Sequence, residues 1–270
     1  MSAAPSETVA APEEAPIGSA RKWAITASVM VVTVMQVLDV TVTNVALPHI
    51  QGSLSAGVDE VSWVLTSYLA ANAVVLPATG WLAGALGRKR LFLGCTVMFT
   101  AASVLCGLAP NITWLLVARM LQGIGGGPLM PLSQAIMWEI FPLRQRGMAM
   151  AAWGVGIMMA PIFGPTLGGW ISDNWSWRWI FYINVPIGVI ALVVVASQVP
   201  GTLRRVHHVI DYLGTAVLSL AVTSLILLTS LGGTTYPWRS APRPSSATSS
   251  RLANAASTWG CSGRSSAWPA

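Results

Sequence analysis

Seven apolar runs dominate the sequence and restrict the folds that the chain can adopt. They cover approximately residues 24–45, 61–82, 91–109, 112–136, 147–170, 179–199 and 212–231. A helix needs about 20 apolar residues to cross a hydrocarbon core about 30 Å thick. Charged residues make up 9% of the 270 residues, whereas they make up about a quarter of a soluble domain. The sequence therefore predicts an all-α integral membrane protein and excludes a water-soluble fold.

Basic residues gather in the connections on one side of these runs. Nine of them lie in the N-terminal tail and in the loops after the second, fourth and sixth runs: Arg21, Lys22, Arg88, Lys89, Arg90, Arg144, Arg146, Arg204 and Arg205. The opposite loops carry only Arg178. Cytoplasmic loops carry the excess of Lys and Arg, so we expect a cytoplasmic N-terminus in a multi-pass protein of the cell membrane. Tryptophans at the run ends agree with this assignment, because they favour the membrane interface.

Several classes of function lack the residues they need. The net charge of +6 is spread over loops, so no basic face suggests a nucleic-acid partner. His49, His207 and His208 do not converge with cysteines or carboxylates at metal-ligand spacing. The sequence has no phosphate-binding GxxxxGK[ST] loop and no nucleophile–base arrangement. We therefore expect no catalytic activity, no metal and no cofactor.

Two charged side chains lie inside the apolar runs. Asp39 is the only acidic residue well inside any run, and Arg119 is the only basic one. Gln36 lies three residues before Asp39 and Thr43 lies four residues after it, so the three side chains form a polar stripe on one face of a helix. At 1.5 Å per residue, both charges lie about 9–10 Å below the outer boundary. Intramembrane charges mark functional sites by default, and the matched depth predicts an ion pair; a purely structural role for each residue is the alternative.

The fifth run contains a series of small residues four positions apart. These are Ala152, Gly156, Ala160, Gly164 and Gly168. They lie along one side of a helix and form a groove that lets another helix approach closely in lipid. We expect this groove to receive a helix from outside this chain, or a second copy of the chain. Pro161 and Pro165 in the same run remove backbone donors.

The full pattern in this run is more specific than its spacing. GxGxxxxPxxGPxxGG resembles the antiporter signature on the fifth helix of drug:proton exporters of the major facilitator superfamily. Residues 177–188, WRWIFYINVPIG, resemble the 14-helix, EmrB/QacA-type branch of that superfamily. The resemblance implies that the signature residues pack the fifth helix: Gly154, Gly156, Pro161, Gly164, Pro165, Gly168 and Gly169.

Two further strings support the same resemblance. LDxTxxNxALP, residues 38–48, is similar to the first-helix motif of those exporters, where the Asp is implicated in proton coupling. Arg119, Gln122 and the two glycines that follow resemble the RxxQGxG motif of the fourth helix, which is also linked to proton transfer. The resemblance thus implies proton coupling by Asp39 and Arg119, with Gln36, Thr43 and Gln122 as polar residues of the cavity.

The loop after the second run resembles the gating loop of the superfamily in part. Gly80 and Gly87 are expected to permit close helix approach, and Arg88 and Lys89 fit the basic positions. Gly84 and Ala85 stand where the common pattern has Asp and a basic residue, so the charge-relay role of that Asp is not transferred. A loop that is basic only because it faces the cytoplasm is the alternative.

The resemblance and the composition divide the chain into four parts. Residues 1–22 are predicted to be a disordered cytoplasmic tail and 23–199 the six-helix N-terminal half of a transporter. Residues 200–238 are predicted to form a cytoplasmic loop and a seventh helix. Residues 239–270 are rich in Ser, Ala, Arg and Pro, and we interpret them as out-of-frame translation after a frameshift near Trp238; a natural linker is the alternative.

The function implied by the resemblance is proton-driven antiport, in which a proton enters as a drug or another amphipathic compound leaves. The expected partners are the lipid bilayer, protons and that compound, with possible self-association through the fifth helix. Transporters of this kind bind substrate between two halves, so a transport-inactive membrane fragment is one alternative. A helical membrane scaffold or channel subunit is another.

Overall fold

The computed structural model describes residues 18–199 and, beyond them, 214, 217–222, 224–225 and 228. The described residues up to 225 belong to one compact unit, and of the second unit only Leu228 is described. Within the described residues the secondary structure is helical, without a strand, as the all-α prediction required. The predicted tail 239–270 and half of the predicted seventh run, 212–231, lie outside the described residues; the described residues of that run are helical.

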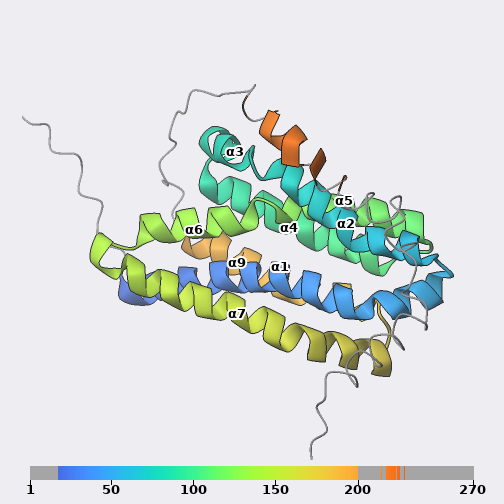
Figure 1. The fold of residues 1–270 in the computed structure, drawn as a ribbon. Coiled ribbons are helices and arrows are strands. Elements are labelled where there is room, and N and C mark those ends of the chain that lie inside the picture. The colour runs from blue at the N-terminus through green and yellow to red at the C-terminus, as the bar shows by residue number, and fades with distance from the viewer. Residues whose placement is uncertain (1–17, 200–213, 215–216, 223, 226–227, 229–270) are drawn as a thin grey trace, which may run out of the picture. The chain divides into compact units, whose positions relative to one another are not determined.

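Nine helices are described between residues 18 and 199, and the long ones run side by side (Figure 1). They are α1 (Ser19–Leu54), α2 (Val58–Val75), α3 (Thr79–Leu86), α4 (Arg88–Gly107), α5 (Ile112–Gly126), α6 (Leu129–Ile140), α7 (Leu143–Asn174), α8 (Trp179–Tyr182) and α9 (Asn184–Gln198). Helix α1 begins at Ser19, so residues 19–22 of the predicted disordered tail are helical. Arg21 contributes to that order, because its Nε donates a hydrogen bond to the Gln198 carbonyl, 3.0 Å away.

Four helical segments of the described part are long and apolar enough to cross a membrane individually. They are Ala20–Leu54, Arg88–Gly107, Leu143–Asn174 and Trp179–Gln198. A fifth candidate is the bent pair Val58–Val75 and Thr79–Leu86. The sequence predicted six runs up to residue 199. The remaining run, 112–136, is divided between α5 and α6, which are 15 and 12 residues long.

A proline lies at each of the two interruptions. Helices α2 and α3 meet at an angle of 58°, and Pro77 lies in the break between them. Pro128 lies between α5 and α6. Proline lacks the backbone N–H that would continue the helical hydrogen bonds, and its ring collides with the preceding turn. The hydropathy of a run does not register this loss, so the sequence predicted continuous spans.

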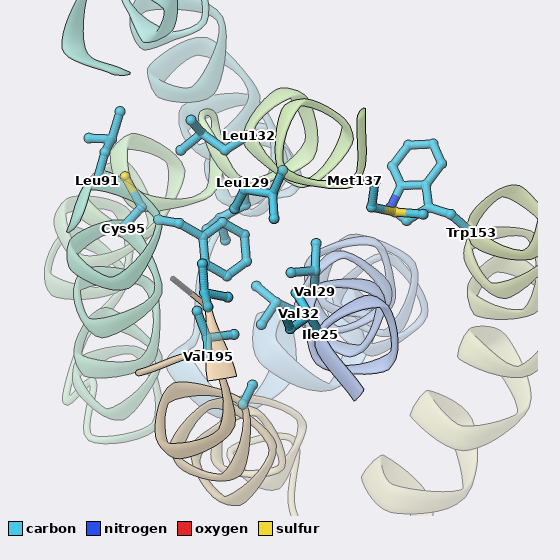
Figure 2. Close-up of a cluster of buried hydrophobic side chains, with 14 of the residues drawn as sticks. Ile25, Val29, Val32, Leu91, Cys95, Leu129, Leu132, Met137, Trp153 and Val195 are labelled. Atoms are coloured by element: carbon cyan, nitrogen blue, oxygen red, sulfur yellow. The ribbon is translucent and has the colours of Figure 1, made fainter. Parts of the chain in front are cut away.

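Two apolar clusters hold the helices together, one towards each end of α1. The first contains Ile25, Val29 and Val32 of α1 and joins them to side chains of α4, α6, α7 and α9 (Figure 2). The second contains Val42, Ala46 and Ile50 of α1, with side chains of α2, α5, α7 and α8. The part of α1 between the two clusters carries Asp39.

The small-residue groove of α7 packs against α1 of the same chain. A Cβ atom on Gly156 would meet the Met30 side chain, and one on Gly164 would meet the Thr41 hydroxyl. A Cβ atom on Gly168 would lie 3.0 Å from the Val42 backbone. The predicted outside partner for this groove is therefore wrong, since α1 already fills it. The spacing identified the groove correctly but did not identify the helix that occupies it.

The antiporter-signature residues outside the groove make little or no close contact with α1. A Cβ atom on Gly154 would meet nothing within 4 Å, and one on Gly169 would make only an ordinary contact with Val45. Pro161 and Pro165 are exposed on the other side of α7, which continues unbroken through both of them. Exposed neighbours on that side include Met158, Ile162 and Phe163, which suits a surface covered by lipid.

Candidate functional site

Five polar side chains from four helices meet between the two apolar clusters. They are Asp39 of α1, Ser103 of α4, Arg119 and Gln122 of α5, and Asn184 of α9. All five are buried, with at most 2% of the residue surface exposed. A buried polar group is costly unless it is hydrogen-bonded, and a buried charge is costly unless it is paired. This arrangement meets both requirements for Asp39.

Asp39 and Arg119 form a buried ion pair, as their matched depth predicted. Arg119 Nη1 lies 2.5 Å from Asp39 Oδ2, and both side chains are fully buried. The same Nη1 donates to Gln122 Oε1 at 2.7 Å. Arg119 Nε donates to the backbone carbonyl of Val64 in α2 at 3.2 Å. The guanidinium thus links α5 to α1 and α2.

Two amide side chains complete the coordination of Asp39. Gln122 Nε2 and Asn184 Nδ2 each donate to Asp39 Oδ1 at 2.9 Å. Gln122 Nε2 also lies 2.8 Å from Ser103 Oγ. Every partner of the carboxylate in this arrangement is a donor, and only an ionised carboxylate accepts at both oxygens without donating. The site therefore uses both Asp39 oxygens as acceptors and ties this side chain to helices α5 and α9.

Two aromatic rings flank the guanidinium. Arg119 Cζ lies 4.6 Å from the centre of the Tyr68 ring and 5.5 Å from that of Phe181. A cation over an aromatic face is attracted by the ring quadrupole, most strongly where water is excluded. Tyr68 and Phe181 thus stabilise the charge of Arg119 from α2 and α8 while keeping its surroundings apolar.

Glycines in α5 bring its neighbours close enough to reach Arg119. A Cβ atom on Gly123 would collide with the Tyr68 carbonyl, and one on Gly125 would lie 2.8 Å from the Phe99 amide nitrogen. Helices α2 and α4 therefore approach the α5 backbone on two sides. This close approach explains the glycines that follow Arg119 and Gln122 in the RxxQGxG string, and it brings the Val64 carbonyl within hydrogen-bonding distance.

The predicted cavity residues behave differently from one another. Gln122 joins the network directly. Gln36 and Thr43 are buried, but Gln36 Oε1 and Thr43 Oγ1 have no hydrogen-bond partner among the described residues. The stripe on α1 thus exists: Asp39 is at the centre of the network, and Gln36 lies against the Tyr68 hydroxyl.

Sequence reasoning missed Asn184, Ser103 and Tyr68 as members of the site. Asn184 carried a usable signal, because it is an amide within an apolar run and such residues commonly form bonds between membrane helices. Ser103 and Tyr68 carried weaker signals. A serine in a membrane helix can bond to its own backbone, and Ser103 Oγ also donates to the Phe99 carbonyl.

The basic residues of the predicted gating loop lie in the first turn of α4. Their contacts could not be predicted from their charge alone. Arg88 Nη1 pairs with Glu139 Oε2 of α6 at 2.6 Å. Lys89 Nζ donates to the carbonyls of Ala196 and Val199 at the end of α9, at 2.8 and 2.5 Å. A cation at this position satisfies carbonyls that the last helical turn leaves without partners.

The expected role of the two loop glycines is wrong. A Cβ atom on Gly80 or Gly87 would meet nothing within 4 Å, so neither glycine permits a close helix contact here. Gly87 has a φ of 85°, between the end of α3 and the start of α4. Residues with a side chain rarely adopt this φ, so the backbone turn requires the glycine.

No cluster of three or more His, Cys, Asp or Glu side chains suited to a metal ion occurs in the part of the chain that the structure describes. A small cavity lies next to the network, between α1, α7, α8 and α9. Asp39 and Asn184 border it, and its other lining residues are aliphatic: Leu38, Val42, Leu167, Ile180, Ile183 and Ile187.

Comparisons with known proteins agree with this architecture. A solved structure of the peptide transporter POT in complex with alafosfalin matches with a TM-score of 0.61 at 15% identity, over 76% of this chain and 46% of that one. This likeness shows the shared fold. Multidrug export protein EmrB of Haemophilus influenzae is 46% identical over 210 residues, which are 77% of this chain and 41% of the relative.

Other relatives match over the same region. EmrB of Escherichia coli K12 is 41% identical over 221 residues, 82% of this chain and 43% of the relative. The fatty acid resistance protein FarB of Neisseria gonorrhoeae is 41% identical over 216 residues, 80% of this chain and 42% of the relative. The chain thus spans about two-fifths of the length of these relatives and matches their N-terminal, EmrB-type part. The sequence profile of the Major Facilitator Superfamily matches residues 29–235, and the chain belongs to that superfamily.

Proposed function

We propose that this chain supplies the proton-coupling half of an exporter that moves amphipathic small molecules across the cell membrane in exchange for protons. The observation that carries the proposal is the ion pair of Asp39 and Arg119, buried between two apolar clusters. A charge in this position is expensive to bury, and a structural pair could be replaced by apolar side chains at little cost in stability. Proton coupling would explain why the chain contains an ion pair that is costly to bury.

Protonation of Asp39 would change its bonding to two other helices at once. A neutral carboxyl group no longer attracts the guanidinium of Arg119, and its O–H requires an acceptor where the site now presents donors. The contacts of Asp39 with α5 and α9 would then weaken together. Binding and release of a proton would in this way shift the packing of α1 against α5 and α9, and rocking of one half of such a transporter against the other exposes the substrate site alternately to the two sides of the membrane.

The names of the relatives support the substrate class. Two are named for multidrug export and one for fatty acid resistance. Drugs that partition into membranes and fatty acids share an apolar body with a polar end. We therefore assign an amphipathic substrate that is taken up from the bilayer or its surface. The basic loops support a cytoplasmic N-terminus, which sets the direction of export.

Proton-driven efflux from liposomes tests the proposal. The full chain is reconstituted, a pH gradient is imposed, and export of a fluorescent amphipathic dye is recorded. We expect export that depends on the gradient and is lost in Asp39→Asn. Asp59→Asn is the matched control, because Asp59 is exposed at the start of α2 and its substitution should leave export unchanged. Gradient-independent leakage would favour a channel subunit, and absence of export in every variant would favour a scaffold or an inactive fragment.

A further inference from the structure

Three polar atoms near the ion pair are buried without a hydrogen-bond partner among the described residues. They are Gln36 Oε1, Tyr68 Oη and Arg119 Nη2. The three residues are at most 7% exposed. An unpaired buried polar atom is costly, and most such atoms in native proteins are satisfied by protein groups or by ordered water.

These atoms belong to one side of the Asp39–Arg119 pair. Gln36 precedes Asp39 on the same face of α1. Tyr68 follows Val64, whose carbonyl accepts a hydrogen bond from Arg119, by one turn of α2. The Tyr68 ring stacks on the guanidinium at 4.6 Å. The side chains of Gln36 and Asn72 both lie close enough to the Tyr68 hydroxyl to interact with it as hydrogen-bonding groups.

Glycine leaves the space that the Tyr68 hydroxyl occupies. A Cβ atom on Gly126 of α5 would lie 2.8 Å from this oxygen, closer than a carbon atom normally approaches it. Asn72, one turn further along α2, is only half-buried. Polar groups therefore continue from the fully buried ion pair towards the C-terminal end of α2, where Asn72 is more exposed than the pair.

We propose that Tyr68, Gln36 and Arg119 together hold ordered water beside the ion pair and that this water carries protons between Asp39 and the Asn72 end of α2. Arg119 Nη2 donates to the water, Gln36 Oε1 accepts from it, and the Tyr68 hydroxyl does either. Water with three partners of this kind is typical of buried hydration sites. Thr43 lies one turn after Asp39 along α1, whereas Gln36 lies one turn before it, so Thr43 is not part of this site.

The proton transfer balances without another reactant. A protonated water in the site gives its proton to a carboxylate oxygen of Asp39, where an O–H bond forms as the ion pair with Arg119 opens. The neutral water that remains satisfies the guanidinium after Asp39 has released it. This relay role rests on the proposed proton coupling, whereas the hydration of the site does not.

Solid-state NMR of the full chain in liposomes tests the hydration directly. Magnetisation is transferred from water protons to the rings of isotopically labelled Tyr and Phe. We expect the Tyr68 ring to receive magnetisation early and the Phe92 ring late, because Phe92 is fully buried in the first apolar cluster and lies about two turns of α4 before the part of that helix that meets Tyr68. Loss of one signal in Tyr68→Phe assigns the Tyr68 resonance. Equally slow transfer to the Tyr68 and Phe92 rings would overturn the proposal.

Two substitutions show whether the named residues hold the water. Gln36→Leu removes the acceptor, and Gly126→Ala places a methyl group where the phenol oxygen lies. Both should abolish the early Tyr68 signal while circular dichroism still reports a helical protein. An early signal that persists in both variants would contradict this hydration site.

Transport separates the relay from the proposed function. If the chain exports dye in a proton-dependent manner, Tyr68→Phe should lower the proton-driven rate while the ring and its contact with Arg119 remain. An unchanged rate would overturn the relay role alone. If the unmodified chain exports nothing, the proposed function fails, and the NMR result still decides whether the site is hydrated.

Discussion

Asp39 illustrates how far single residues could be interpreted from sequence. Counting residues from the ends of two apolar runs placed Asp39 and Arg119 at one depth, and the structure joins them at 2.5 Å. Their charge made them conspicuous, since a lone charge in lipid needs a partner. Asn184 and Ser103 were not recognised, because neutral polar residues satisfy themselves in several ways within a helix and only tertiary packing decides which applies.

Removing one member of the ion pair should cost more stability than removing both. In Asp39→Leu the guanidinium of Arg119 remains buried without its counter-ion, and we expect unfolding to become easier by about 3 kcal/mol. The double variant Asp39→Leu/Arg119→Met should recover most of this loss, because no unpaired charge remains. Denaturant titration in mixed micelles measures both. A double variant that is as unstable as the sum of the two single variants would contradict this account.

Helix α7 shows what spacing reveals about an element and what it omits. Glycine and alanine at every fourth position predicted a surface for close helix contact, and that surface exists. The pattern does not name the partner, which proved to be α1. Similarly, the apolar runs located the helices but not the breaks at Pro77 and Pro128. Hydropathy does not detect a break, and proline alone does not either, because Pro161 and Pro165 lie inside an unbroken helix.

Two glycines of α7 should respond oppositely to substitution. Gly164→Ala places a methyl group against the Thr41 hydroxyl, and we expect a loss of about 1–3 kcal/mol from overpacking between α1 and α7. Gly154→Ala has open space around it and should be neutral, or stabilising by up to about 1 kcal/mol through helix propensity. Thermal unfolding in detergent compares the two. Equal effects would show that this groove does not hold α1 closely.

Helix α9 depends on a lysine from another helix for its C-terminal hydrogen bonds. Lys89→Met removes the donor to the Ala196 and Val199 carbonyls, and we expect a loss of about 1 kcal/mol, as for a typical hydrogen bond. Arg90→Met is the control, since Arg90 is exposed beside it. Amide hydrogen exchange of the last turn of α9 should quicken in Lys89→Met alone. Equal exchange in both variants would assign the stability of this turn to other contacts.

At the scale of the described bundle, a layer of buried polar side chains lies between two clusters of apolar side chains. The network of Asp39 crosses α1, α4, α5 and α9, and each apolar cluster packs the same bundle on one side of it. The order of the runs and their charges were enough to predict the fold class. The pairing of helices was not, because it follows from close contacts at individual glycines that sequence spacing does not assign to a partner.

The orientation of the bundle in the membrane gives the last prediction. The basic residues of the described part gather where α3 meets α4 and where α6 meets α7, as at Arg90 and Arg144, whereas the turn after α7 carries only Arg178. Exposed tryptophans mark both ends, Trp138 near one and Trp175 near the other. The positive-inside rule places the first end in the cytoplasm.

Single cysteines at Arg90 and Asn174, both exposed, report the two ends in intact cells. The native Cys95, Cys106 and Cys261 are first replaced by alanine. A membrane-impermeant maleimide added outside should label Asn174→Cys and spare Arg90→Cys until the cells are opened. Three predicted membrane-crossing runs, 91–109, 112–136 and 147–170, lie between these positions, so the two cysteines are expected on opposite sides of the membrane. Labelling both from outside would contradict the span assignment. Labelling of Arg90→Cys alone would reverse the orientation and, with it, the direction of the proposed export.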